Sequence, residues 1–239
     1  MTYTWTSEDG GLYESVPSTH PAISSLWRAV VTQPYEWTDA ANEFWGLALT
    51  RGPDGARSVE LVGPALRPRP LVMEPGHEHW GVELAAHVVV VGVPKRGLLD
   101  VIVDLPVSGS WFELAGVRYP FVDHDGLPGL IDAMLVQGTL VADPALGAAL
   151  DGAAGWSERS LQRHVRDQTG LSPKQVEQRR RVRHAYALMQ QGLPLAEAAV
   201  AAGYSDQAHM TRDFGLLAGI TPARVLREYL DGERGDVLR

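Results

Sequence analysis

Two stretches near the C-terminal end of the sequence carry polar side chains that could read nucleic acid bases. The first begins at Trp156 (WSERSLQRHVRDQTGLSP), and its polar residues three, four and seven apart are Arg159, Gln162, Arg163 and Arg166. The second begins at Tyr204 (YSDQAHMTRDFGLLAGITP); His209 and Arg212 point outward from it, with Gln207 and Ala208 at its start. Arginine pairs with guanine and glutamine pairs with adenine in the major groove of DNA. Both stretches therefore have the side-chain chemistry of base-reading helices.

Apolar residues occupy the opposite side of both stretches. Leu161 and Val165 lie four residues apart in the first, and Met210, Phe214 and Leu217 line the second. A helix with this pattern packs on its apolar side and leaves the polar side exposed. One such helix would fit the solvated face of an ordinary helical bundle. Two in the same register favour DNA binding.

The two stretches form an internal repeat with a shift of 49 positions. Leu161 falls on Met210, Arg163 on Arg212, Val165 on Phe214, Gly170 on Gly219 and Pro173 on Pro222. A repeat of this length indicates one supersecondary unit used twice. Ser172 and Thr221 each precede a proline, which predicts a helix N-cap followed by proline in the first turn. Each copy thus predicts the second helix of a helix-turn-helix, a glycine turn and a new helix.

A long helix over Pro173–Gln191 connects the two copies. Its predicted buried stripe follows the helical spacing and consists of Val182, Ala185, Tyr186 and Met189. The helix that precedes the first recognition helix is expected at about 144–154. Gly147, Asp151 and Gly152 weaken it.

These motifs resemble the C-terminal DNA-binding domain of AraC/XylS-type transcriptional regulators. The match is carried by Ser157-x-Arg159-x-Leu161-Gln162-Arg163 and by the segment from Gly203-Tyr204-Ser205-Asp206-Gln207 through Gly219-Ile220-Thr221-Pro222. The resemblance implies sequence-specific transcription control, with the two recognition helices in successive major grooves. It further implies double-stranded DNA as partner, a cytoplasmic location, and no enzymatic activity or cofactor. A small-molecule effector and a homodimer are additional options.

Several positions depart from the family pattern or extend it. Val165 and Met210 stand where phenylalanine is usual, and Gly215 replaces the usual lysine or arginine. Asp213, next to Gly215, is expected to face DNA and repel phosphate. Lys174 and Arg180, by contrast, are expected to contact phosphate and to contribute to the salt dependence of binding.

The net charge of −8 is unevenly distributed along the 239 residues. Residues 1–139 carry −9, residues 140–239 carry +1, and residues 156–190 carry +5. Phosphate attraction acts over about 10 Å at ordinary salt, so the local surplus matters more than the total. The charge therefore permits DNA binding without arguing for it.

Length and composition predict two modest domains. Cysteine is absent, which excludes disulfides and thiolate metal sites. The polar, acidic N-terminus shows no signal peptide, and the longest apolar runs are too short to cross a bilayer.

The first half alternates short apolar segments with Gly/Pro turns, which predicts a mainly-β barrel or sandwich of cupin-like type. The candidate strands lie within Asn42–Thr50, Ser58–Val62, Leu71–Met73, Trp80–Leu84, Val88–Val93 and Leu98–Leu105. A turn is expected at 51–55. A helical pattern follows over Leu127–Val141, with Leu127, Leu130, Ile131 and Met134 on one face. The overall class is α+β, with a β-rich sensor or dimerisation domain at 1–140 and an all-α DNA-binding domain at 141–239. Leu61-Val62-Gly63-Pro64 resembles part of the sensor barrels of the same regulators.

One pattern in this half could bind a metal ion. His77, His79 and Glu83 have the spacing H-x-H-x-x-x-E, which resembles the first metal motif of cupin barrels, and they would share one face of a strand. Imidazole and carboxylate together suit Zn, Fe, Mn or Ni. The motif's leading glycine and a second cupin motif are missing, and Pro75-Gly76 places a turn beside the histidines. His124 could add a fourth ligand only if the fold brings it near.

Three interpretations of the first half therefore remain open. It could sense a ligand, it could hold the metal of a cupin-type enzyme with a degenerate helical appendage, or it could have lost its effector. Six of the seven tryptophans fall in this half. They are expected either to line an apolar pocket or to fill the core.

Overall fold

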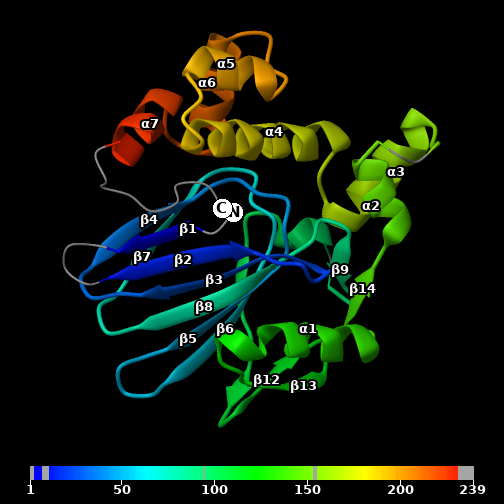
Figure 1. Ribbon diagram of the computed structural model, residues 1–239. Coiled ribbons are helices and arrows are strands. Elements are labelled where there is room, and N and C mark those ends of the chain that lie inside the picture. The colour runs from blue at the N-terminus through cyan, green and yellow to red at the C-terminus, as the bar shows by residue number, and fades with distance from the viewer. Residues whose placement is uncertain (1–2, 7–10, 94, 153–154, 231–239) are drawn as a thin grey trace.

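The computed structural model describes residues 3–6, 11–93, 95–152 and 155–230. A β-rich region is followed by a set of helices that lies across one end of it (Figure 1). The expected α+β class, with strands first and helices last, is confirmed.

The β-rich region is built on a seven-stranded antiparallel sheet in the order β1-β2-β3-β8-β5-β6-β10. Its strands are β1 (Tyr3–Thr6), β2 (Leu12–Pro17), β3 (Ile23–Val30), β5 (Gly46–Arg51), β6 (Arg57–Val62), β8 (Glu78–Leu84) and β10 (Ile102–Asp104). The turn expected at 51–55 connects β5 to β6, and Gly55 adopts the positive φ of 82° that this turn requires.

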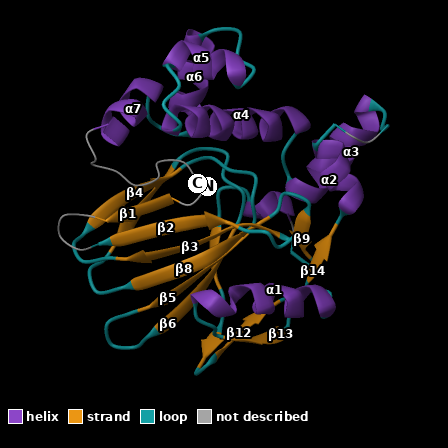
Figure 2. Ribbon diagram, in the orientation of Figure 1, coloured by secondary structure: helices purple, strands orange, loops and turns teal. Residues whose placement is uncertain are grey.

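Alternating side chains give the sheet two different faces. Leu47 and Leu49 of β5 enter the main core, whereas Ala48 and Thr50 point to the other side. A two-stranded sheet of β4 (Tyr35–Asp39) and β7 (Arg69–Met73) lies over that second face (Figure 2). The space between the two sheets, here called the lumen, is lined by residues that include Trp27, Ala48, Thr50, Glu60, Leu71 and Met73.

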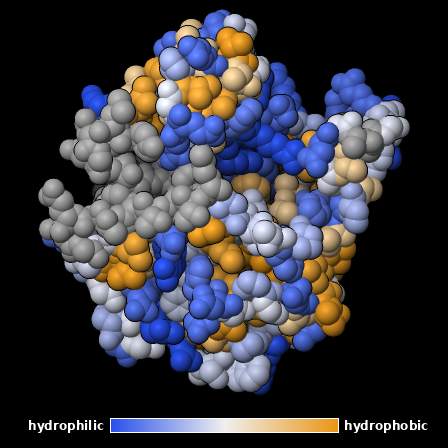
Figure 3. All heavy atoms as spheres, viewed as in Figure 1, coloured by the Kyte–Doolittle hydropathy of each residue, from blue (hydrophilic) through white to orange (hydrophobic). Residues whose placement is uncertain are grey.

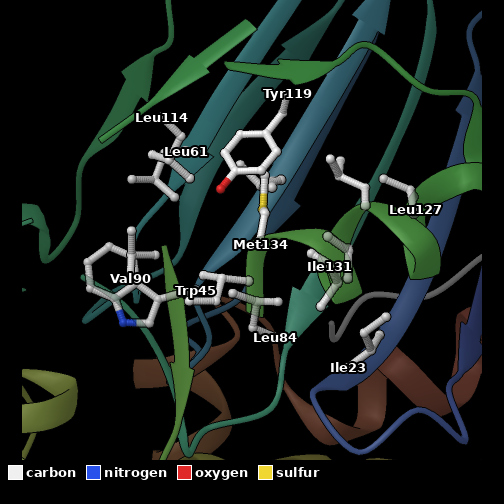
Figure 4. Close-up of a cluster of buried hydrophobic side chains, with 14 of the residues drawn as sticks. Ile23, Trp45, Leu61, Leu84, Val90, Leu114, Tyr119, Leu127, Ile131 and Met134 are labelled. Carbon is white, nitrogen blue, oxygen red and sulfur yellow. The ribbon is translucent and has the colours of Figure 1, made fainter. Parts of the chain in front are cut away.

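The main core lies on the first face, between the sheet, helix α1 (Leu127–Val136) and the strands β11 (Val107–Ser108), β12 (Trp111–Leu114) and β13 (Val117–Pro120). Figure 4 shows Trp45, Tyr119, Ile131 and Met134 among its side chains. The four apolar residues predicted for one face of this helix are all buried.

Three predicted elements are shorter than expected. Helix α1 stops at Val136, because Gly138 turns the chain with a φ of 74° and Leu140–Ala142 then forms strand β14. Strand β14 pairs with β9 (Val88–Val90), which is shorter than the strand predicted from the apolar run Val88–Val93. The predicted strand Leu98–Leu105 contains only β10, because the 3-10 helix η1 (Lys95–Leu98) occupies its beginning. A second 3-10 helix, η2 (His124–Gly126), leads into α1.

The helical region confirms the predicted double helix-turn-helix with its central helix. Its helices are α2 (Pro144–Leu150), α3 (Glu158–Thr169), α4 (Pro173–Gln190), α5 (Leu195–Ala201), α6 (Gln207–Leu217) and α7 (Pro222–Leu230). The predicted stripe of α4 is buried along its whole length. Helices α5–α7 pack on one side of α4, and α2 and α3 lie at its beginning (Figure 1). Hydrophilic side chains follow α4 between these two groups (Figure 3). Among the described residues, none of the helices combines the length and apolar character needed to cross a bilayer.

Candidate nucleic-acid interface

Helix α3 exposes the polar residues that the sequence assigned to base reading. Ser157 caps its N-terminus by accepting the Ser160 N–H at 3.2 Å, and Gly170 ends it in the left-handed conformation. Val165 is fully buried on the inner side. The exposed residues on the outer side are Arg159, Gln162, Arg163 and Arg166. Within the described residues these three arginines have no ion pair, so their charges are available to an external partner.

Helix α6 repeats this arrangement with fewer charges. Asp206 caps it by accepting the His209 N–H at 2.7 Å, and this hydrogen bond holds the pKa of Asp206 below its usual value. Gln207, Ala208 and Arg212 are exposed. His209 is half-buried and packs edge-on against Tyr204 at 5.1 Å between ring centroids, so it is less available than the sequence suggested.

The equivalent positions His164 and Asp213 anchor the two helices to their neighbours. His164 Nε2 lies 2.6 Å from the carboxylate of Asp143, which caps α2. Asp213 is buried and lies 3.7 Å from Arg181 of α4. The expectation that Asp213 repels phosphate is therefore wrong. It follows Met210 by three residues and adjoins Phe214, which places it on the packed side of the helix.

The two candidate phosphate contacts on α4 lie in different surroundings. Lys174 is exposed in the first turn. Arg180 donates to the Leu150 carbonyl at 2.8 Å and to the Asp151 carboxylate at 3.1 Å. Its guanidinium holds the end of α2, so Lys174 is the better placed of the two to meet phosphate.

The region that contains these helices matches a known protein family. Residues 152–228 match a family described as a helix-turn-helix domain. This region is an AraC-type helix-turn-helix domain. No curated protein matches the chain.

The solved structures that resemble the whole chain include ToxT from Vibrio cholerae. One ToxT structure has 9% sequence identity and a TM-score of 0.42, over 84% of this chain and 96% of that one. Another, of ToxT bound to (E)-4-(8-methylnaphthalen-1-yl)but-3-enoic acid, has 10% identity and a TM-score of 0.40, over 85% and 97% of the two chains.

The β-rich region contacts the AraC-type domain at the end of each recognition helix. A Cβ added to Gly170, after α3, would lie 3.1 Å from the side chain of Leu99. A Cβ added to Gly219, after α6, would lie 3.4 Å from Pro68. These two glycines are equivalent in the 49-residue repeat. The β-rich region thus touches both helices at the same point, away from their exposed polar sides.

Segment 39–44 forms the closest connection between the two regions. The Ala41 N–H donates to the Leu217 carbonyl at the end of α6, at 2.7 Å. Ala40 and Ala41 belong to the apolar cluster around α4. Arg183 of α4 pairs with the fully buried carboxylate of Glu43, with one hydrogen bond of 2.7 Å. Burial alone would lower the pKa of Arg183, but this pairing outweighs it and raises the pKa.

Arg179 ties α4 to a second loop of the β-rich region. Its guanidinium is buried and donates to the carbonyls of Ala65 and Leu66. Burial lowers its pKa, and Glu43 opposes that shift. A buried charge is tolerated only when its hydrogen bonds are satisfied, so these carbonyls fix how α4 sits on the β-rich region.

The structure brings two of the three candidate metal ligands side by side: the rings of His77 and His79 stack with their centroids 5.9 Å apart. His79 and Glu83 share the lumen face of β8 as expected, and His77 precedes that strand. Between them lies Gly81, and a Cβ there would be 2.5 Å from the Trp27 indole. Among the described residues, no group of three or more His, Cys, Asp or Glu could hold a metal, with His124 or without it. The enzyme interpretation therefore loses the feature that suggested it.

The tryptophans are divided between the lumen, the core and the surface. Trp27 lines the lumen, Trp45 and Trp80 are buried, and Trp111 is half-exposed. The side chains of Trp5 and Trp37 lie outside the described part. A single tryptophan, Trp27, is thus known to contribute to the pocket.

Proposed function

We propose that this chain is a transcription regulator that reads a double-stranded DNA site with α3 and α6 and responds to a small molecule bound in the lumen. The supporting observation is that both recognition helices expose arginine on one side while the β-rich region contacts their C-terminal ends. Residues 1–140 serve as the sensor domain and residues 141–239 as the DNA-binding domain.

The exposed residues divide by the contacts that they are suited to make. Arg163 and Arg212 occupy equivalent positions near the middle of their helices and read bases, with Gln162 and Gln207 beside them. Arg159, Arg166 and Lys174 contact phosphate. Because α3 carries three exposed arginines and α6 one, the first unit contributes more of the affinity.

Segment 39–44 carries the signal between the lumen and the DNA-binding domain. Asp39 lines the lumen. Two residues later, Ala41 is hydrogen-bonded to the end of α6, and two residues after that, Glu43 pairs with α4. Segment 39–44 can take two positions, and a ligand that binds the protein more tightly in one of them favours the arrangement of α6 and α3 that goes with it. The ligand can change the equilibrium between the two arrangements by no more than the difference in its affinity for them.

The test is selection of binding sites from random double-stranded DNA, followed by titration of the selected site at several salt concentrations. Arg163→Ala is expected to weaken specific binding by about 1–3 kcal/mol and to relax the preference at one base pair. Lys174→Ala is expected to lower the slope of affinity against salt while sequence preference stays.

Arg118→Ala is the matched control, because Arg118 is exposed on β13 of the β-rich region. It should leave both measurements unchanged. Failure to enrich any DNA motif, or an equal loss for Arg163→Ala on every sequence, would contradict the proposed role of α3.

A further inference from the structure

The lumen is a cavity lined by both apolar and acidic side chains. Its volume is about 310 Å³, at the small end of the range for small-molecule sites. Trp27, Leu71 and Ile102 contribute apolar surface. The volume and the indole suit a compact ligand with an aromatic or aliphatic body.

Carboxylates outnumber positive groups around this cavity. Among the described lining residues, Asp39, Glu60 and Glu74 are acidic, His77 and His79 are imidazoles, and none is lysine or arginine. The nearest arginine, Arg69, already pairs with one oxygen of Asp39 at 2.6 Å. Arg69 balances Asp39, so the charge left over in the lining comes from Glu60 and Glu74 and is negative.

Glu60 is held in an electrostatically unfavourable position. It lies directly opposite Asp104 on the neighbouring strand β10. Like charges opposite each other on adjacent strands destabilise a sheet. Burial, and after it the charge of Asp104, raises the pKa of Glu60, and Arg69 only partly opposes this. A positive group in the lumen would relieve this repulsion.

Asp39 supplies a second sign of a missing partner, beside Arg69, whose Nε and Nη1 are also buried without a hydrogen-bond partner among the described residues. The residue is 4% exposed, and its Oδ2 is bonded to Arg69. Its Oδ1 is buried and has no hydrogen-bond partner among the described residues. A buried acceptor without a donor costs free energy, which a ligand N–H would recover.

We propose that the lumen binds a small organic cation, an amine with an apolar body. The ammonium lies with Glu60 and Asp39, and the apolar body lies against Trp27. An anionic ligand would meet uncompensated carboxylates, and a neutral one would leave them without a counter-charge. This inference rests on the proposed role of the lumen as the effector site.

The test is calorimetric titration of the full chain at neutral pH with two matched sets of probes. The first set is tryptamine, tryptophol and indole-3-acetate; the second is hexylamine, hexanol and hexanoate. In at least one set, the amine is expected to bind at least about tenfold more tightly than its alcohol, because a hydrogen bond to a charged group contributes roughly that much affinity. The acid of that set is expected to bind most weakly.

Glu60→Gln should reduce binding of that amine by about tenfold and leave the alcohol unchanged. The substitution keeps the shape of the side chain and removes the repulsion from Asp104, so thermal stability should be kept or increased. Weak binding then cannot be explained by misfolding. Glu113→Gln is the control, because Glu113 is exposed on β12, outside the cavity.

The inference is overturned if, in both sets, the alcohol or the acid binds as tightly as the amine, or if Glu60→Gln leaves amine binding intact. DNA-site selection on ligand-free protein separates this outcome from failure of the proposed function. A selected DNA motif without amine preference refutes only the cationic ligand, whereas amine binding without any DNA motif refutes the regulator.

Discussion

The two helix-turn-helix units share a sequence pattern but differ in what holds them together. In the second unit, Met210, Phe214 and Leu217 of α6 belong to a large buried cluster that surrounds α4. In the first, only four buried residues form the cluster: Leu146, Val165, Leu171 and Val176. Leu66 and Leu99 of the β-rich region pack against this small cluster.

Both clusters include residues of α4 and receive side chains from the β-rich region: Ala40 and Ala41 belong to the larger cluster of the second unit, and Leu66 and Leu99 pack against the smaller one. The first unit, with the smaller core, therefore depends more on the β-rich region for its stability than the second. The first unit also carries more exposed arginine, so the unit to which we assign more of the DNA affinity is the one with the smaller core of its own. A regulator organised in this way can change its DNA affinity through small changes at the domain contact.

The largest expected effect comes from the core of the second unit. Phe214 is fully buried. Phe214→Ala should lower the free energy of unfolding by about 3–5 kcal/mol because it removes a ring and leaves a cavity. Val165→Ala should cost less, because fewer carbon atoms are lost. Denaturant unfolding measures both, and hydrogen exchange should show α5 and α6 losing protection while α3 keeps it. Equal loss in α3 would mean that the two units are not independently held.

The contrast between the units also shows what the sequence could predict. The central helix was predicted over Pro173–Gln191 and spans Pro173–Gln190, because caps and helical periodicity are local signals. The hairpin of β12 and β13 was not predicted, although Phe112 and Leu114 alternate with exposed residues. Four residues are too short a stretch for that alternation to stand out.

Long-range contacts were beyond sequence reasoning. The side of Asp213 that meets Arg181 depends on how α6 crosses α4. The Trp27 indole over Gly81 depends on the pairing of β3 with β8, which brings together residues 54 positions apart in the chain. The exposed arginines of α3 were predictable because one helix alone sets which residues share a face. The acidic lining of the lumen needed the sheet order, which no local pattern supplies.

A smaller effect should come from the contact between the sensor domain and the first unit. Leu99 is half-buried and packs beside Gly170 at the end of α3. Leu99→Ala should cost about 1–2 kcal/mol, less than truncation of a fully buried leucine. Hydrogen exchange should become faster in α3 and remain unchanged in α6. Val136→Ala is the control, because Val136 is 87% exposed. Faster exchange in both helices would show that the sensor domain holds the two units equally.

The smallest effect concerns the contact between His164 of α3 and Asp143, the residue that caps α2. Burial would raise the pKa of Asp143, but hydrogen bonds from the Leu146 N–H and from His164 outweigh it and lower the pKa. A carboxylate with a lowered folded-state pKa stabilises the protein above its unfolded value of 3.8, and this stabilisation is lost as the pH falls through the folded pKa. Asp143→Asn keeps an oxygen that can cap α2 but removes the charge, so it should cost up to about 1 kcal/mol at neutral pH.

The pH dependence of that cost distinguishes the ion pair from simple capping. The difference between wild type and Asp143→Asn, measured by denaturant unfolding, should shrink as the pH falls below about 4, because Asp143 then becomes neutral as well. Asp206→Asn, a change of another helix-capping aspartate, at the start of α6 in the second unit, should have less effect. Asp206 is exposed, and it makes no ion pair with any described residue. An equal loss of stability in both variants at every pH would contradict this prediction. The contact between His164 and Asp143 would then contribute nothing beyond the helix cap, and the two units would differ only in their cores.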